Sequence, residues 1–535
     1  MHLRLIATVG LSLLGSTSLH AQDFQAHDTQ AQTKADAGVA HFDVMAYQVI
    51  GNSTLRNLDI EKAVYPYLGP QRSEQDVEAA RAALQALYDK SGYPTVSVVI
   101  PEQDASTGLV TLQVNEQKVG RLRVNGADYF SPDDIERAAP SLAEGAVPNF
   151  KDVQRDIVAL NQWPDRRVTP EVKAGATPNT VDVDLNVEDT LPLHGSLELN
   201  NRNSSGTTEQ RLSASLRYDN LWQRGHSISL SGQVAPQRRE DAEVVSASYL
   251  ARFGPSPWSL LGYAVRSKSD IAVVGDLNVI GNGTLVGLRL MRAFEPGEGF
   301  FHSLSLGLDY KDFKENLVQG ADRGSVPIEY YPLSLNYNAD WVKERSLSDL
   351  AFSAVFNLRG VGDDRAAFDA KRYQAQPNFF YLRGSGSRTW KFAGDAQLML
   401  RLQGQFAAEP LISNEQFSIG GLDSVRGYYE SESLGDLGAV AQLEARTPSF
   451  ADALGSGFEE LRLRAFVDAG YARINDPLPE QTRSETLISA GVGASLKAFG
   501  HLNGSIDVAR PLSNPGGGKD DRDSVEVGFR VWGEF

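Results

Sequence analysis

Apolar and polar residues follow two different periods along this chain of 535 residues. Up to about residue 190, segments with the helical spacing of three and four alternate with short strand-like segments. From about Leu191 to Phe535 the helical spacing disappears, and apolar and polar positions alternate one by one. Period-two alternation is typical of β-strands whose two faces have different surroundings. The pattern therefore predicts an α+β region at 42–190, followed by a large all-β region at 191–535.

The α+β region contains the same order of elements twice, over residues 42–117 and 118–190. The first copy is expected to have a strand at 42–50, helices at 55–67 and from Ser73, and strands at 95–100 and 109–115. The second copy is expected to have a strand at 119–125, helices at 132–139 and 150–161, and strands at 167–173 and 181–188. This repeat indicates two tandem copies of one folding unit.

The helix of the first copy that begins after Ser73 has signals at both ends. Ser73 and Asp76 have the spacing of a capping box, in which each side chain accepts a hydrogen bond from the other residue's backbone. Gly92 and Pro94 are expected to end the helix. A βααββ unit exposes a sheet edge and a groove that accept an extended chain by strand addition. The alternative is that the two copies are only spacers.

The segment 390–406 shows the alternation of the all-β region most clearly. One face would carry Trp390, Phe392, Ala396, Leu398, Leu400, Leu402 and Phe406, and the other Lys391, Asp395, Gln397, Arg401, Gln403 and Gln405. This pattern fits a soluble sandwich with a dry core, and it equally fits an outer-membrane barrel with lipid outside and a wet lumen. The local pattern does not separate the two folds.

Loop lengths separate these two folds. We expect about 16 strands, near 193–200, 208–219, 225–235, 243–253, 258–268, 283–294, 300–313, 329–342, 348–359, 372–383, 389–406, 438–448, 461–472, 485–498, 500–510 and 524–535. Gaps after odd strands are mostly the longer ones, and gaps after even strands mostly have four or five residues, except 449–460. This alternation is typical of bacterial outer-membrane barrels, and an even strand count returns both ends to the periplasm. We therefore expect a transmembrane β-barrel of antiparallel strands with an aqueous channel.

Both ends of the chain carry features of an exported protein. Residues 1–21 are predicted to be a signal peptide, with Arg4 before a short apolar stretch and small residues near its end. The polar residues 22–41 are interpreted as a linker. The last strand places its apolar residues on one face and is expected to face lipid, ending on the aromatic Phe535 at the membrane interface.

The composition excludes some kinds of binding site and makes some kinds of partner poor candidates. The chain has no cysteine, which excludes disulfides and thiolate zinc sites. Acidic residues exceed Lys plus Arg by 68 − 51 = 17, so nucleic acid is a poor candidate partner. After the first 20 residues there is no apolar run of 18 residues, which argues against a bundle of membrane helices.

Two short motifs lie at corresponding places in the predicted barrel. The loop Ala407–Leu437, the sixth on the outer side, contains Val425, Arg426, Gly427 and Tyr428 in a row. The thirteenth strand contains Phe466, Asp468 and Gly470 at every second position. Because side chains alternate along a strand, Asp468 is expected on the lumen side together with Arg462 and Arg464.

The signal peptide, the two βααββ units, the barrel and these motifs together resemble the two-partner-secretion transporters (TpsB type, FhaC/ShlB-like), which are related to the barrel-assembly protein BamA. The resemblance implies that the two units are POTRA domains in the periplasm and that the barrel lies in the outer membrane. It implies secretion of a large exoprotein of the haemolysin, haemagglutinin or adhesin type, with the POTRA domains binding the unfolded cargo. Outer-membrane lipid and, during biogenesis, the barrel-assembly machinery are the other implied partners, with Phe535 as the assembly signal.

The resemblance also implies roles for the motif residues. The sixth loop would fold back into the lumen, and Arg426 would pair with Asp468. A guanidinium makes directed hydrogen bonds to a carboxylate, and in a wet lumen the pair is expected to contribute on the order of 1 kcal/mol. Many members of this family have a helix that plugs the barrel, but residues 22–41 are too few for such a helix and its return. We therefore expect the sixth loop to be the main obstruction.

Sequence motifs for catalysis or nucleotide binding are missing. The chain has no G-x-S-x-G, no H-E-x-x-H and no P-loop motif, so we predict no enzyme activity and no cofactor or metal. The alternative functions are an assembly factor of the BamA type, which usually has more POTRA domains, and a passive porin, which would leave the two α+β copies without a purpose.

Overall fold

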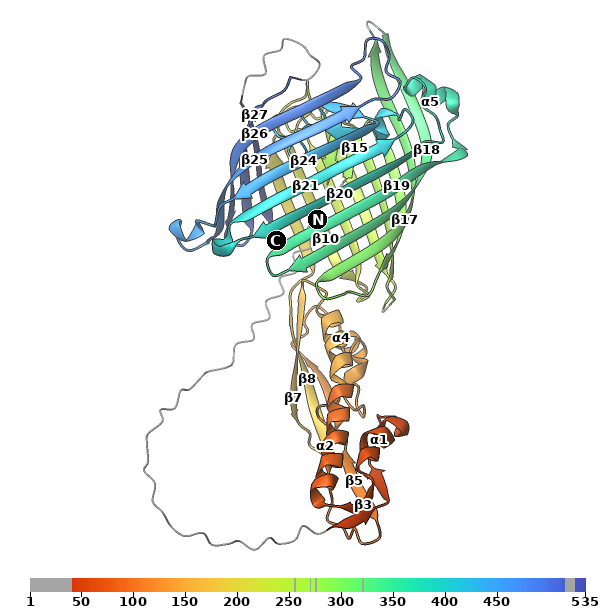
Figure 1. Ribbon diagram of the computed structural model, residues 1–535. Coiled ribbons are helices and arrows are strands. Elements are labelled where there is room, and N and C mark those ends of the chain that lie inside the picture. Colours follow the sequence, from red (N-terminus) through yellow and green to blue (C-terminus); the bar gives the residue numbers. More distant parts are fainter. Residues whose placement is uncertain (1–40, 255, 270, 275–276, 320–321, 515–524) are drawn as a thin grey trace. The chain divides into compact units, whose positions relative to one another are not determined.

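The computed structural model describes residues 41–254, 256–269, 271–274, 277–319, 322–514 and 525–535. The predicted signal peptide at 1–21 and nearly all of the predicted linker at 22–41 lie outside these residues. The described chain divides into two compact units, one that ends at Leu191 and one that begins at Pro192. Each unit is described by itself (Figure 1). Among the described residues, no helix has both the length and the apolar character needed to cross a membrane.

The first copy of the α+β repeat has a small mixed sheet covered by two helices. Its elements are β1 (Phe42–Val44), β2 (Ala46–Ile50), α1 (Asn57–Val64), β3 (Gly69–Arg72), α2 (Glu74–Ser91), β4 (Ser97–Val99) and β5 (Leu109–Asn115). The sheet order is β2-β5-β4, with β2 parallel to β5, and β1 pairs separately with β3. The core lies between the sheet and the helices and includes Leu84, Tyr88 and Leu112.

The second copy repeats this topology. Its elements are β6 (Lys118–Asn125), α3 (Pro132–Arg137), α4 (Phe150–Leu160), β7 (Arg166–Ala174) and β8 (Thr180–Asp189). The sheet order is β6-β8-β7, with β6 parallel to β8. In both copies the last strand is therefore the central one, β5 or β8. The first strand, β2 or β6, lies on one side of it, and the remaining strand, β4 or β7, lies on the other.

Three details of the first copy differ from the sequence prediction. The predicted strand at 42–50 is interrupted at Met45, because the backbone N–H groups of Met45 and Ala46 both turn to the carbonyl of Gly108. The predicted helix at 55–67 ends at Val64 and continues as a 3₁₀ turn that contains Pro66, which has no N–H to donate to an α-helical hydrogen bond. The short strand β3 was not predicted.

The capping signals of α2 are present as predicted. Ser73 N donates to Asp76 Oδ2 at 2.8 Å, Asp76 N donates to Ser73 Oγ at 3.4 Å, and Gly92 ends the helix with a φ of 97°. The end of α2 also meets the start of α4 from the second copy. Asn149 Nδ2 donates to the Ser91 carbonyl at 2.9 Å, and Phe150 N donates to the Gly92 carbonyl at 2.7 Å. These hydrogen bonds join the two copies directly.

An acidic residue holds the turn after the first sheet strand in each copy. In the first copy, Glu116 accepts hydrogen bonds from the backbone and hydroxyl groups of Ser53 and Thr54. In the second copy, Asp189 accepts from the backbone N–H groups of residues 128–130. Each turn begins with a glycine at positive φ, Gly51 or Gly126, whose missing Cβ would lie within 2.5 Å of a backbone carbonyl oxygen.

The second unit is a closed barrel of 16 antiparallel strands, as predicted. The positions predicted for two of them, 372–383 and 389–406, were wrong, because the strands run over 380–391 and 397–407 with a turn between them at Gly394. Trp390 pairs with Leu398 across this turn, so the apolar alternation continues through it and hides it in the sequence. The strands are β9 (Leu193–Asn200), β10 (Arg211–Leu221), β11 (His226–Val234), β12 (Glu243–Arg252), β13 (Trp258–Ser267), β16 (Gly283–Ala293), β17 (Phe300–Gln319), β18 (Asp322–Lys343), β19 (Ser346–Gly362), β20 (Phe380–Lys391), β21 (Gln397–Ala407), β24 (Leu437–Arg446), β25 (Phe458–Arg473), β26 (Ser484–Ala498), β27 (Leu502–Pro511) and β28 (Glu526–Glu534). The short pair β14 (Ile271–Val274) and β15 (Leu277–Ile280) stands outside the barrel sheet. The barrel closes where β28 pairs with β9, and Phe535 exchanges two backbone hydrogen bonds with Gly195.

The two faces of the barrel wall differ as the alternation predicts. On β25, Leu463 and Val467 are about half exposed on the outer face, whereas Phe466 and Asp468 on the inner face are buried. The interior is less wet than expected, because part of it is a packed apolar cluster that includes Ile328, Phe379 and Leu411. Phe368 of the helix α5 (Arg365–Lys371), which was not predicted, belongs to the same cluster. The sixth loop is therefore not the sole segment packed against the inner wall.

Candidate functional site

The sixth loop, residues 408–436 between β21 and β24, folds against the inner wall of the barrel; we call it loop 6. It contains a 3₁₀ turn at Ser413–Glu415 and a hairpin of β22 (Phe417–Ile419) and β23 (Ser433–Gly435). The hairpin contacts β24 and β25. Val425 and Arg426 near its tip are buried, Arg426 to 4% exposure. The motif of the loop is therefore enclosed by the barrel.

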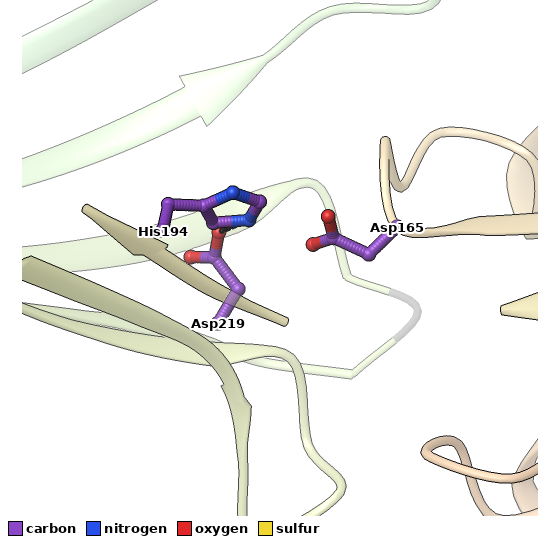
Figure 2. Close-up of side chains that lie close together, drawn as sticks. All are labelled: Asp165, His194 and Asp219. Atoms are coloured by element: carbon purple, nitrogen blue, oxygen red, sulfur yellow. Dashed lines mark ion pairs between the residues drawn. The ribbon is translucent and has the colours of Figure 1, made fainter. Parts of the chain in front are cut away.

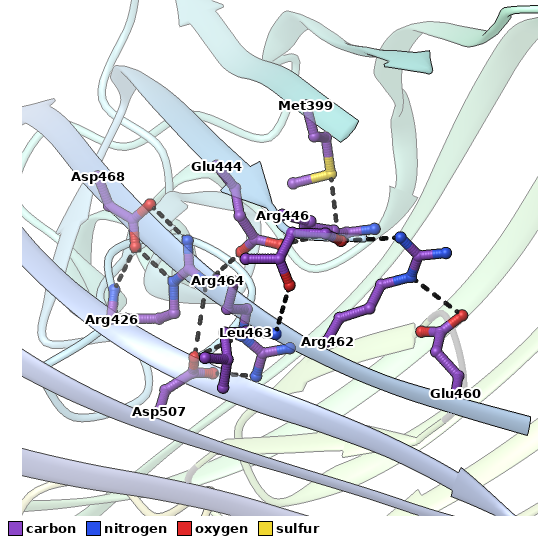
Figure 3. Close-up of polar contacts among 11 residues, drawn as sticks. Met399, Arg426, Glu444, Arg446, Glu460, Arg462, Leu463, Arg464, Asp468 and Asp507 are labelled. Carbon is purple, nitrogen blue, oxygen red and sulfur yellow. Dashed lines mark hydrogen bonds and ion pairs between the residues drawn. The ribbon is translucent and has the colours of Figure 1, made fainter. Parts of the chain in front are cut away.

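Arg426 and Asp468 form a two-pronged ion pair (Figure 3). Arg426 Nε donates to Asp468 Oδ2 at 2.7 Å, and Nη2 donates to Oδ1 at 2.9 Å. The backbone N–H of Arg426 adds a third hydrogen bond to Oδ2 at 3.2 Å. The remaining guanidinium nitrogen, Nη1, donates to Glu444 Oε2 of β24 at 2.6 Å. We call this set of contacts the Arg426 anchor.

Further charges continue the Arg426 anchor along the wall, with alternating sign (Figure 3). Arg446 Nε donates to Glu444 Oε1 at 2.6 Å. Arg464 of β25 donates to both oxygens of Asp507 on β27, at 2.7 and 2.8 Å, and Asp507 also lies 3.9 Å from Arg426 Nη1. Three arginines thus face three carboxylates, which balances the charge of this buried cluster.

The predicted lumen arginine Arg462 lies on the same face of β25 but belongs to another contact. It is buried, and its Nη1 donates to the carbonyls of Asp395 and Thr447 at 2.7 and 2.9 Å. Its Nη2 makes an ion pair with the Asp395 carboxylate. Arg462 therefore joins β25 to the segment just before β21 and to the segment just after β24. It does not reach Arg426.

Each residue of the strand motif has its own contact with loop 6. The guanidinium carbon of Arg426 lies 3.4 Å from the ring centre of Phe466, so the ring supports the cation from one side. Asp468 accepts the hydrogen bonds. Gly470 leaves space for the loop, since a Cβ there would lie 2.7 Å from Val425 Cγ2. The period-two spacing places all three under the loop tip.

The other residues of the loop motif fit the wall in a similar way. Gly427 has a φ of 88°, and a Cβ there would lie 3.1 Å from Ala509 Cβ of β27. The Tyr428 hydroxyl lies 2.7 Å from the Ser513 carbonyl and 2.9 Å from the Ile488 carbonyl, and both oxygens are possible acceptors of its hydrogen bond. The motif thus joins the loop to β24, β25, β26 and β27 together.

The burial of the Arg426 anchor corrects the energetic expectation. The wet-lumen figure of about 1 kcal/mol applies to exposed pairs, but the Asp468 carboxylate has no exposed surface. Removing one partner of a buried pair leaves the other charge unpaired, at a cost of about 3–5 kcal/mol. Loss of one partner of the anchor is therefore more costly than loss of one partner of a solvated pair, because it leaves a buried charge without a counter-charge.

Two glycines of β26 belong to this site and were missed by the sequence prediction. A Cβ at Gly491 would lie 2.4 Å from the ring of Phe466, and a Cβ at Gly493 would lie 2.2 Å from Asp507 Oδ1. Glycines inside a strand often mark a close approach of another group. The G-x-G sequence at 491–493 could therefore have indicated that other groups pack closely against this strand.

Loop 6 also has two acids outside the motif that were not predicted, the buried Asp436 and the partly buried Glu430. Asp436 at its end accepts hydrogen bonds from Arg372, from Leu411 N at 2.9 Å and from Asn475 N at 2.6 Å. Glu430 accepts from Arg202 Nε at 2.9 Å, just after β9. Both carboxylates join loop 6 to other loops at the same end of the barrel.

A smaller polar contact lies at the start of the barrel. His194 Nε2 of β9 is 3.5 Å from Asp219 Oδ2 of β10 (Figure 2). Arg217 Nε donates to the same oxygen at 2.9 Å. Asp165, which Figure 2 also draws, belongs to the other unit. These contacts stabilise the base of the first strands and do not touch loop 6.

Comparison with known proteins places this architecture in a family. The outer membrane transporter CdiB of Dickeya dadantii (strain 3937) is 25% identical over 459 residues, which cover 83% of this chain and 78% of that protein. The heme/hemopexin transporter protein HuxB of Haemophilus influenzae (strain ATCC 51907 / DSM 11121 / KW20 / Rd) is 21% identical over 461 residues, covering 84% and 79%.

Solved structures show the same fold. CdiB from Escherichia coli has a TM-score of 0.67 at 20% identity and covers 95% of this chain and 93% of that one. BamA from Haemophilus ducreyi without POTRA domains 1–3 has a TM-score of 0.56 at 14% identity, with coverage of 93% and 100%.

Family models match both units of the chain. The ShlB-type POTRA domain model matches residues 42–117. The model of the haemolysin secretion/activation protein family ShlB/FhaC/HecB matches residues 179–496, more than half of the chain. Together with the barrel and the POTRA topology described above, this match shows that the chain belongs to the ShlB/FhaC/HecB family of haemolysin secretion and activation proteins.

Proposed function

We propose that this chain secretes one large exoprotein through its barrel and that loop 6 is the segment that must rearrange for the cargo to pass. The chain is an outer-membrane transporter of two-partner secretion, with its POTRA region in the periplasm. The observation that carries the role of loop 6 is the buried Arg426 anchor, which holds the loop against the inner wall of the barrel.

The two α+β copies are the proposed receptor for the unfolded cargo. β2 and β4 are the edges of one sheet, and β6 and β7 are the edges of the other. Such edges offer backbone hydrogen bonds to an extended chain and need few specific side chains. The cargo is expected to be an exoprotein of the haemolysin, haemagglutinin or adhesin type, and the chain itself is expected to carry out no catalytic step.

Lipid and the barrel-assembly machinery are the other proposed partners. The outer face of the barrel exposes large apolar side chains such as Leu306, Leu402 and Val492, as a wall in contact with lipid should. The C-terminal residue Phe535 is proposed as the signal that the assembly machinery binds during insertion.

The test is export of the cargo by an Arg426→Ala variant. This change removes the cation beside Asp468 and Glu444, so loop 6 should lose its fixed position, and we expect secretion to fall at least tenfold. Secreted cargo is measured in the culture medium and barrel in the outer membrane by its heat-modifiable migration. Arg388→Gln is a matched control, because Arg388 is an exposed arginine of β20 that lies over Trp390.

Normal secretion by Arg426→Ala, with normal amounts of folded barrel, would contradict the role of loop 6. Depletion of the whole protein tests the class of function separately. Loss of one exoprotein from the medium is the expected result, whereas a general loss of outer-membrane barrels would point to an assembly factor instead.

A further inference from the structure

Glu415 of loop 6 is a buried carboxylate that lies apart from the Arg426 anchor. It is 2% exposed and ends the 3₁₀ turn just before β22. Lys311 Nζ and the Tyr330 hydroxyl donate to its Oε1 at 2.5 and 2.6 Å, and the Tyr381 hydroxyl donates to its Oε2 at 2.8 Å. A carboxylate is tolerated at such a buried position when it is paired and hydrogen-bonded in this way. We call these contacts the Glu415 anchor.

The two anchors lie on different strands of the barrel. The donors of the Glu415 anchor come from β17, β18 and β20, whereas Arg426 contacts β24 and β25 and approaches Asp507 of β27. In the closed order of 16 strands, the nearest members of the two sets, β20 and β24, are two positions apart, with β21 between them. Loop 6 is therefore held to two neighbouring but separate parts of the wall.

The charges at the two anchors are reversed. At one anchor a cation of the loop meets acids of the wall, and at the other an acid of the loop meets a lysine and two phenols of the wall. The Arg426 anchor and the charges that continue it have three arginines and three carboxylates, whereas the Glu415 anchor has one ion pair, between Glu415 and Lys311. Moving loop 6 away from the wall would therefore break fewer ion pairs at the Glu415 anchor than at the Arg426 anchor.

The Glu415 anchor also involves loop 5, residues 363–379, which carries α5. The rings of Phe368 and Phe379 pack edge-on against Tyr330, with ring centres 5.9 and 6.0 Å away. Arg372 donates to the carbonyl of Leu411 at 2.6 Å and makes an ion pair with Asp436. Tyr330 thus contacts both Glu415 of loop 6 and the aromatic residues of loop 5.

We propose that Glu415 is a second positioning residue, which through Lys311, Tyr330 and Tyr381 holds loop 6 and loop 5 to the part of the wall formed by β17, β18 and β20, which Arg426 does not contact. Its release opens the pore, while the Arg426 anchor keeps the loop attached to β24 and β25. The cargo-dependent part of this inference rests on the proposed function, but closure of the empty pore does not.

The experiment records single channels of the purified full-length protein in planar bilayers, without cargo. Glu415→Gln and Lys311→Met each remove the ion pair, and Tyr381→Phe removes one hydrogen bond while keeping the ring in the apolar cluster. The first two should raise the frequency of open events by about tenfold or more, as expected for the loss of a charged hydrogen bond, and Tyr381→Phe should have a smaller effect. Glu480→Gln is the control, because Glu480 is an exposed carboxylate of the next external loop.

An exchange of the two charges tests whether the contact itself is responsible. The double variant Glu415→Lys with Lys311→Glu should return the open frequency toward that of the wild type. The inference is overturned if Glu415→Gln and Lys311→Met form folded barrels that stay as closed as the wild type. It is also overturned if the exchange leaves the channel as open as the single variants.

The outcomes for the two hypotheses are distinguishable. Loss of export in Arg426→Ala together with closed Glu415→Gln channels would keep the proposed function and reject the second anchor. Open Glu415→Gln channels together with normal export in Arg426→Ala would keep the second anchor and reject the role of loop 6 in export.

Discussion

At the scale of single residues, the fit of loop 6 depends on positions where a side chain is missing as much as on charges. Gly470 faces Val425 of the loop motif, Gly491 faces the Phe466 ring that supports Arg426, and Gly493 faces Asp507. Interior glycines destabilise a strand, so their presence in the wall beneath one loop indicates that close packing outweighs this cost. Arg426 itself needs that packing, because a buried guanidinium is stable only with partners on every side.

A substitution at Gly470 should therefore displace the loop without removing a charge. In Gly470→Val, the new side chain would occupy the place of Val425 Cγ2, and we expect the loop tip to leave the wall and export to fall several-fold. Cleavage of loop 6 by added protease in intact cells measures this displacement. Gly504→Ala is the control, since a Cβ at Gly504 of β27 meets no atom within 4 Å. Unchanged protease resistance in Gly470→Val would contradict this account.

At the scale of elements, the sequence predicts features that depend on neighbouring residues. It does not predict contacts between residues that are far apart in the sequence. The capping box of α2 and the period-two alternation of the barrel strands are local signals, and both predictions are confirmed. The partners Glu444 and Asp507 were not predicted, because the residues that face each other depend on the stagger between strands. The helix α5 was missed because seven residues within a loop carry little periodicity.

The turns after β2 and β6 depend on an acid at the end of the last strand of each copy. Burial alone raises the pKa of Glu116, but the hydrogen bonds from Ser53 and Thr54 outweigh burial and lower its pKa below the usual value. The folded pKa is thus below the unfolded value of about 4.3. The charged form stabilises the fold above that value, and this stabilisation is lost as the pH falls through the folded pKa.

Glu116→Gln should therefore destabilise the turn at pH 7 by about 1–3 kcal/mol and should have a smaller effect near pH 3. Hydrogen exchange of the Ser53 and Thr54 amides in the full-length protein, compared between variant and wild type at each pH, measures this difference. Glu102→Gln, at an exposed position between β4 and β5, is the control. Equal exchange in the Glu116→Gln variant and the wild type at pH 7 would exclude the role of the charge.

At the scale of the whole molecule, the chain offers a path for a polypeptide but no P-loop motif for nucleotide binding. We expect the cargo to supply the driving force, because a chain that folds outside the cell cannot easily return through a narrow pore. The free energy of folding of a domain, about 5–15 kcal/mol, is large enough to bias transit in one direction. A channel in which loop 6 is held at two separate places on the wall would then open for an extended chain and close after it.

A cargo that cannot fold tests this expectation. Substitutions that prevent the exoprotein from folding, placed outside its N-terminal region, should slow its appearance outside the cell several-fold while the transporter level stays constant. Pulse-labelling of the cargo with timed protease treatment of intact cells measures the rate. Export of the unfoldable cargo at the normal rate would show that another source of energy is used.

The direct junction between the two α+β copies has a consequence for how a captured chain is presented. The backbone of Phe150 and the side chain of Asn149 bind the last residues of α2, so the start of α4 is built on the end of the preceding copy. Because the two copies are joined in this way, the edge strands of their two sheets lie at a fixed distance from each other. A cargo strand bound to the first copy would reach the second copy at a fixed spacing. The distance between two binding segments in the cargo would therefore contribute to its recognition.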